Sequence, residues 1–156
     1  GEKAKAGAMS GDDDLIRLYS QRILALAADI PLTERLTAPH VTVRKRAPLC
    51  GSTVTVDLVL EGDRIVSFGQ DVKACALGQA SAAILAAEVV GCDRSEIAAA
   101  RDELVAMLRS GGPVPSAPFG AYEVLLPARD YRNRHASILL ALDATLDSID
   151  QSLQAA

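Results

Sequence analysis

The chain contains 156 residues, and its 16 lysines and arginines against 20 aspartates and glutamates give a formal net charge of −4 at pH 7. Apolar residues make up 49% of it, which supplies the core of one domain and excludes wholesale disorder. Aromatic residues make up only 3% and the charge balance is acidic, so we expect no nucleic-acid binding. The sequence has no run of about 18 apolar residues, so we expect no membrane-spanning helix.

The cysteine count is three, and an odd number in a chain without a recognisable signal peptide does not indicate a disulfide framework. The number of cysteines alone leaves three roles possible for them, as buried inert thiols, as metal ligands or as a reactive thiol. We expect the protein to be cytoplasmic, where thiols stay reduced.

The N-terminal part of the chain divides into a tail and a helix. Residues 1–10 have no apolar period and resemble a disordered tail or an expression scar, so residues 11–156 are expected to form a single domain. Apolar residues at helical spacing from Leu15 to Ile30 predict the first helix, which Pro31 ends. The acidic run Asp12–Asp14 suits the positive N-terminal end of that helix.

The period then changes to the alternation of β-strands. Residues 40–46 alternate, and residues 53–60 alternate more cleanly, with every second side chain a valine or leucine. A turn at residues 61–63 leads into a third apolar stretch at residues 64–68. We therefore predict three antiparallel strands.

The second half of the chain is helical. An alanine-rich helix is predicted over residues 76–90, and a capping box from Asp93 to Glu96 opens the next one, which runs to about Arg109. A loop at residues 110–119 and a short segment broken by Pro127 precede a last helix over residues 132–154. Strands followed by helices predict an α+β fold, a three-stranded antiparallel sheet with helices packed on one face.

Two cysteines occupy positions suited to chemistry. Cys50 lies in the short Ala47–Ser52 connection between two predicted strands, where Gly51 leaves space beside the sulfur. Cys75 enters a predicted helix, whose N-terminus would lower the pKa of a thiol. An ordinary loop cysteine and a small buried hydrophobic residue are the alternatives for the two.

The remaining candidates carry less chemical information. Cys92 lies in an interhelical turn without a companion motif, and we expect it to be structural, as we do His40 at the start of the first strand. His135 opens the last helix. The arginine-rich segments 44–46 and 129–134 are usually solvated faces, but beside the cysteines they would favour thiolates and attract acidic partners. No Ser/His/Asp set, phosphate loop, HExxH or CxxC motif is present, so we expect no independent enzyme.

The order of these segments resembles the NifU/IscU-type iron–sulfur cluster assembly scaffolds, and in particular their SufU-like branch. The resemblance runs from about Leu15 to Leu153, and the long segment between Cys75 and His135 favours the SufU-like branch. It rests on Pro39-His40, Pro48-Leu-Cys-Gly51, Thr53–Ile65, Cys75-Ala-Leu-Gly-Gln-Ala-Ser-Ala-Ala-Ile84 and Arg132-Asn-Arg-His-Ala-Ser-Ile-Leu-Leu140. The family fold, a leading helix, a three-stranded antiparallel sheet and packed helices, agrees with the predicted elements.

The resemblance implies that Cys50 and Cys75 correspond to the first two cysteines of the family site. At two other positions of that site the sequence departs from the family pattern. Ser52 stands where the family has an aspartate, and the third cysteine is missing. In one alignment His135 replaces that thiol, and in the other His135 is the family histidine and Ala136 has lost the thiol.

These residues lead to three hypotheses. The first is a scaffold that binds a labile iron–sulfur cluster, or an iron or zinc ion, through Cys50, Cys75 and His135. The resemblance then implies a SufS- or IscS-like cysteine desulfurase and cluster acceptor proteins as partners. The second is a SufE-like sulfur acceptor in which Cys50 takes a persulfide from the desulfurase. The third is a diverged interaction module that binds no metal.

Overall fold

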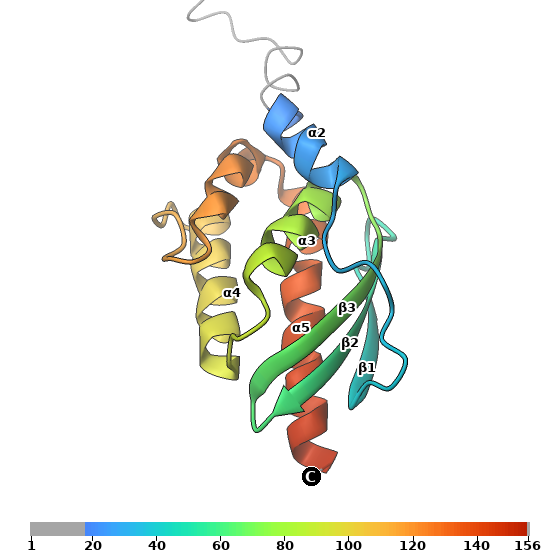
Figure 1. Cartoon of the computed structure of the whole chain (residues 1–156). Helices are drawn as coiled ribbons and strands as arrows, with labels where there is room; N and C mark the ends of the chain where they lie inside the picture. The colour runs from blue at the N-terminus through green and yellow to red at the C-terminus, as the bar shows by residue number, and fades with distance from the viewer. Residues whose placement is uncertain (1–17, 156) are drawn as a thin grey trace, which may run out of the picture.

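A three-stranded antiparallel sheet with helices on one face forms the fold, as the sequence predicts (Figure 1). The structure, a computed structural model, describes residues 18–155. The strand order is β1-β2-β3. In chain order the elements are α2 (Gln21–Ala28), β1 (Val41–Arg46), β2 (Thr53–Glu61), β3 (Arg64–Lys73), α3 (Ala76–Glu88), α4 (Arg94–Arg109), the 3₁₀ helices η1 (Gly120–Asp130) and η2 (Arg132–Arg134), and α5 (His135–Ala155).

The core lies between the inner face of the sheet and the helices α3 and α5, and α5 runs along the length of the sheet (Figure 1). Alternation in β2 turns Val54, Val56 and Leu58 inward, where none is more than 2% exposed. Burying an aliphatic side chain of this size stabilises the fold by about 1.5–3 kcal/mol. From α5, the predicted apolar face contributes Ile138, Leu139, Leu142 and Ile149 as buried residues and Leu146 as a half-buried one.

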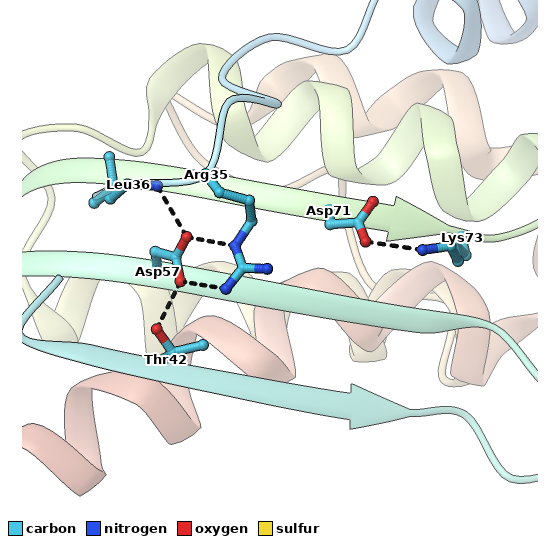
Figure 2. Close-up of polar contacts among 6 residues, drawn as sticks. All are labelled: Arg35, Leu36, Thr42, Asp57, Asp71 and Lys73. Carbon is cyan, nitrogen blue, oxygen red and sulfur yellow. Dashed lines mark hydrogen bonds and ion pairs between the residues drawn. The ribbon is translucent and has the colours of Figure 1, made fainter. Parts of the chain in front are cut away.

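The outer face of the sheet is crossed by residues 32–36, which we call the strap. The strap is anchored on Asp57 in β2, a carboxylate with no exposed surface. Asp57 accepts hydrogen bonds from Nε and Nη2 of Arg35 at 2.6 and 3.0 Å, from N of Leu36 at 3.0 Å and from Oγ1 of Thr42 at 2.6 Å (Figure 2). A buried charge with four donors is fully satisfied, so it fixes the strap rather than destabilising the sheet.

The strap also needs a glycine beneath it. Gly69 of β3 pairs with Asp57, and a Cβ atom at this position would lie 2.6 Å from the carbonyl oxygen of Glu34. Further along β3, the backbone N of Gln70 donates to the carbonyl oxygen of Leu32 at 3.0 Å. The strap therefore covers part of the free edge of β3 as well as the middle of the outer face.

Several element boundaries differ from the sequence predictions. β3 extends to Lys73, five residues beyond the predicted end, because its polar second half still pairs with β2 and Gln70 donates to the carbonyl oxygen of Ala82 in α3. The segment around Pro127 does not break but continues as the 3₁₀ helix η1. The last α-helix begins at His135 and is preceded by η2.

The N-terminal predictions are tested only in part. The predicted helix from Leu15 to Ile30 is not continuous, because Tyr19 and Ser20 are not helical. The helix α2 runs from Gln21 to Ala28, with Oγ of its N-cap Ser20 accepting from N of Ile23, and it ends before Pro31. Residues 1–10, the acidic run Asp12–Asp14 and the first two apolar positions of the predicted helix lie outside the described residues. Among residues 18–155, no helix is long and apolar enough to cross a membrane.

The anchor of the strap gives a first prediction. Asp57→Asn removes the negative charge to which Arg35 and Thr42 donate hydrogen bonds. We expect this change to lower the free energy of unfolding by about 2 kcal/mol, because that is the scale of a hydrogen bond to a charged group. Urea denaturation followed by circular dichroism measures this loss. The matched control is Asp71→Asn on the same face, because the exposed pair of Asp71 with Lys73 contributes less than about 1 kcal/mol.

The same carboxylate predicts a pH dependence. Burial alone raises the pKa of Asp57, but hydrogen bonds from Arg35, Thr42 and Leu36 outweigh it and hold the pKa below its ordinary value. A lowered folded pKa contributes stability that is present above the unfolded pKa of about 3.9 and is lost as the pH falls through the folded pKa. The unfolding free energy of the wild type should therefore fall below about pH 4 more steeply than that of Asp57→Asn. Equal slopes for the two proteins would contradict this account.

Candidate functional site

Both candidate cysteines lie at the same end of the sheet. The register pairs Arg46 at the end of β1 with Thr53 at the start of β2, and Thr53 with Lys73 at the end of β3. Cys50 lies in the turn that joins the first two of these strands, and Cys75 follows the third as the N-cap residue of α3. Antiparallel pairing therefore brings Cys50 and Cys75, which are 25 positions apart in sequence, to the same end of the sheet.

The hydroxyl of Ser137 joins the two cysteine-bearing segments. Its Oγ lies 2.9 Å from Oγ of Ser52, which follows the Cys50 turn, and 3.6 Å from Sγ of Cys75. Ser52 and Ser137 are only 3% and 2% exposed. A Cβ atom at Gly78 would lie 2.5 Å from the same hydroxyl, so glycine is what allows α3 to approach α5 this closely.

The surroundings of Cys75 favour its thiolate. Burial by itself raises the pKa of this thiol, but the N–H groups of Gly78 and Leu77, the hydroxyl of Ser137 and the positive charge of Arg134 together lower it below its ordinary value. These groups combine a helix N-terminus with a neighbouring cation, the combination that activates cysteines in general. The geometry thus agrees with the predicted character of Cys75.

The imidazole of His135 is buried, with 1% of its surface exposed. Its Nε2 lies 2.9 Å from the carbonyl oxygen of Ala128, and because a carbonyl only accepts, Nε2 carries the proton. Nδ1 is buried and has no hydrogen-bond partner among the described residues. Metal-binding histidines show this same arrangement, with one ring nitrogen oriented by a carbonyl and the other free to bind.

Cys50 is exposed, in contrast to the other two groups. The neighbouring Leu49 is 90% exposed, an unusual position for a large apolar side chain. Gly51 has a φ of +71°, a left-handed conformation that allows the chain to turn sharply into β2. Nη2 of Arg46 lies 3.9 Å from where a Cβ of Gly51 would be, so a guanidinium group stands beside the turn.

The other candidates from the sequence have structural roles. Sγ of Cys92 donates to the carbonyl oxygen of Glu88, and burial together with nearby carboxylates raises the pKa of this thiol to about 11. Nδ1 of His40 accepts a hydrogen bond from N of Leu60 at the opposite end of the sheet. Arg129 donates to the carbonyl oxygen of Met107 and so ties η1 to α4.

Within residues 18–155, no three side chains of histidine, cysteine, aspartate or glutamate are grouped closely enough to hold a metal ion. The hydroxyl of Ser52 is paired with that of Ser137. Sequence reasoning missed the role of Ser137. The signals in the sequence were its place two residues after His135 and the glycine at position 78, neither of which identifies a hydroxyl contact across 85 residues.

The fold is shared with other solved structures. One is an iron–sulfur cluster assembly scaffold protein for the SUF system of Fervidobacterium islandicum AW-1, with a TM-score of 0.77, 19% identity and coverage of 86% of this chain and 98% of that chain. A structure of a hypothetical protein matches with a TM-score of 0.75 and 20% identity, over 86% of this chain and 98% of the other. These matches define the α+β class of the domain.

A third structure defines the family. The N-terminal NifU-like protein of Brucella abortus is 40% identical, with a TM-score of 0.88 over 92% of this chain and 99% of that chain. The chain therefore belongs to the NifU-like iron–sulfur cluster scaffold family, as its motifs predict. No family model and no curated protein sequence matches it.

The thiol environments give a second prediction, for alkylation by iodoacetamide at pH 7.5. Cys50 should react because it is exposed and Cys75 because its pKa is lowered, whereas Cys92 should stay unmodified in the folded protein. Ser137→Ala removes a hydrogen bond to the Cys75 thiolate, so we expect alkylation of Cys75 to slow about fivefold, equivalent to about 1 kcal/mol. Peptide mass spectrometry follows each cysteine separately.

Ser148→Ala is the matched control, because Ser148 is another buried serine of α5 whose hydroxyl bonds only the carbonyl oxygen of Ala144. This variant should alkylate Cys75 at the wild-type rate. An equal slowing in both serine variants would mean that Ser137 acts through the stability of α5 and not through the thiol.

Proposed function

We propose that this protein is an assembly scaffold that holds a labile iron–sulfur cluster, or an iron or zinc ion, as transient cargo through Cys50, Cys75 and His135. It acts as a carrier and not as an independent enzyme. Its membership of a scaffold family supports the general role. The observation that supports the ligands best is the unpartnered, buried Nδ1 of His135 on the helix that also bonds the two cysteine segments through Ser137.

The donor set suits this cargo. Thiolates are soft ligands for iron–sulfur clusters and zinc, and imidazole binds both iron and zinc. Cys75 is held as the N-cap of α3 and His135 as the first residue of α5, whereas Cys50 is exposed on a turn. We therefore expect Cys50 to be the ligand that moves when cargo binds and leaves.

The serine at position 52 sets the expected strength of binding. A hydroxyl stays neutral at cytoplasmic pH, so Ser52 is a much poorer metal ligand than an aspartate. In addition, its oxygen is already engaged by Ser137. We expect cargo to be held more weakly than in a relative with the complete family ligand set.

A second candidate function follows from the exposure of Cys50. As a SufE-like sulfur acceptor, its thiolate would attack the terminal sulfur of a desulfurase persulfide. The S–S bond of the donor breaks, the donor cysteine leaves as a thiolate, and the terminal sulfur stays on Cys50 as a persulfide. This step requires neither Cys75 nor His135.

The scaffold proposal predicts ligand-dependent metal loading. After anaerobic reconstitution with iron and sulfide, or with zinc alone, the wild type should retain metal at close to one site per chain. Cys50→Ser/Cys75→Ser and His135→Ala should each lose at least about tenfold in affinity, on the scale of losing one ligand or its orienting shell. Metal analysis and visible absorbance measure the content, and Cys92→Ala is the control, since that thiol is buried and protonated.

Metal content in the wild type no higher than in the double cysteine variant would reject the scaffold proposal. Retention by the wild type with full retention by His135→Ala would reject the histidine as a ligand. Circular dichroism of each apoprotein shows whether a loss of metal reflects a loss of fold.

The sulfur-acceptor candidate predicts a covalent product. Incubation with a cysteine desulfurase and cysteine should add 32 mass units, one sulfur atom, to Cys50. The adduct should persist in Cys75→Ser and disappear in Cys50→Ser. An adduct that requires Cys75 would favour the scaffold, and no adduct on Cys50 in the wild type would remove this candidate.

A further inference from the structure

The outer face of the sheet is basic at the end that carries the cysteine turn. The register places two rows there, Arg46 with Thr53 and Lys73, and Arg44 with Thr55 and Asp71. Arg44, Arg46 and Lys73 are exposed. Among residues 18–155, helices α3 and α5 pack against the opposite, inner face of the sheet (Figure 1).

Two of these cations are not neutralised within the described chain. From residue 18 to residue 155, neither Arg44 nor Arg46 has an ion-pair partner. Lys73 pairs with Asp71 at 3.0 Å, and Figure 2 shows this pair beside the clamp of Arg35 on Asp57. The face therefore carries an excess of positive charge on a chain whose formal net charge is −4.

The basic face continues into the cysteine turn. Arg46 is the last residue of β1, and its Nη2 lies 3.9 Å from the Cβ position of Gly51, the residue after Cys50. Leu49, 90% exposed, adds an apolar tip beside the thiol. A charged face next to one exposed apolar side chain is typical of a protein contact, with an apolar anchor surrounded by polar contacts.

We propose that the outer sheet face around Arg44 and Arg46 docks an acidic surface of the partner protein that brings sulfur to Cys50. This inference rests on the proposed function, and it adds the face and the charge by which the partner is recognised. In this complex Leu49 contacts the partner next to the partner's reactive sulfur, and the two arginines steer and orient the partner as it approaches. Opposite potentials accelerate association, and they do so most strongly at low ionic strength.

An acidic protein fits this face better than a nucleic acid or a lipid surface. The rows contain threonines between the cations and no aromatic ring on which a base could stack. The exposed carboxylate of Asp71 lies in the same row as Arg44 and interrupts the positive charge that a continuous phosphate backbone would follow. A protein partner with separate acidic side chains can contact Arg44 and Arg46 and avoid Asp71.

The sulfur step itself needs no further reactant. The Cys50 thiolate attacks the terminal sulfur of the partner's persulfide, a new S–S bond forms on Cys50, and the partner's S–S bond breaks with its cysteine leaving as a thiolate. Docking on the basic face supplies only proximity and orientation to this exchange.

The test measures association with the cysteine desulfurase encoded in the same genome by biolayer interferometry, at about 50 and about 300 mM salt. We expect the wild-type association rate to fall with salt and Arg44→Glu and Arg46→Glu each to lower it about tenfold at the lower salt. The matched control is Arg109→Glu, the same charge change on an exposed arginine of α4, which should stay within about twofold of the wild type. Arg44→Gln and Arg46→Gln, milder changes on the same strand, should lie between, and circular dichroism confirms the fold of each.

Four results would overturn the proposal. They are no binding of the desulfurase to the wild type, an association rate independent of salt, an equal loss in Arg109→Glu, and tighter binding to phosphatidylglycerol vesicles or to single-stranded DNA than to the desulfurase. The metal content of each isolated variant distinguishes a failure of the docking proposal from a failure of the proposed scaffold function. Arg44→Glu, one row further from the cysteine turn than Arg46, should load metal as the wild type does. A wild type that binds the desulfurase but no metal would reject the scaffold role without rejecting the docking face.

Discussion

The contact of Ser137 with Ser52 and Cys75 is the interaction on which the candidate site depends. It joins α5 to the turn after β1 and to the N-cap residue of α3, three segments that are distant in sequence. Its geometry requires Gly78, because any side chain there would displace the Ser137 hydroxyl and separate α3 from α5. A second hydrogen bond, from Oγ of Ser81 to the carbonyl oxygen of Ile138, holds the same two helices one turn further on.

The same interaction satisfies two buried polar groups at once. Ser52 and Ser137 are almost fully buried, and their hydroxyls bond each other. A buried, unpaired carboxylate at position 52 would be costly, whereas two hydroxyls satisfy each other. The serine pair therefore allows the turn before β2 and helix α5 to pack closely together.

The two faces of the sheet have different roles, because the inner face forms the core and the outer face is proposed to bind a partner. The inner face is apolar and holds α3 and α5, while the outer face is polar and is covered in its middle by the strap on Asp57. The strap leaves the end with Arg44, Arg46 and the Cys50 turn open to solvent. The residues proposed to bind cargo and partner therefore lie at the end of the sheet that the strap does not cover.

Local periodicity and capping signals predict the strand alternation and the capping box at Asp93, and the structure confirms both. The tertiary structure alone reveals that Cys50 and Cys75 lie at one end of the sheet, together with the roles of Ser137, Gly69 and Gly78, the extension of β3 and the orientation of the His135 ring. Each of these depends on a contact between residues far apart along the chain, and hydrophobic patterning carries no information about which distant polar atom a side chain will meet.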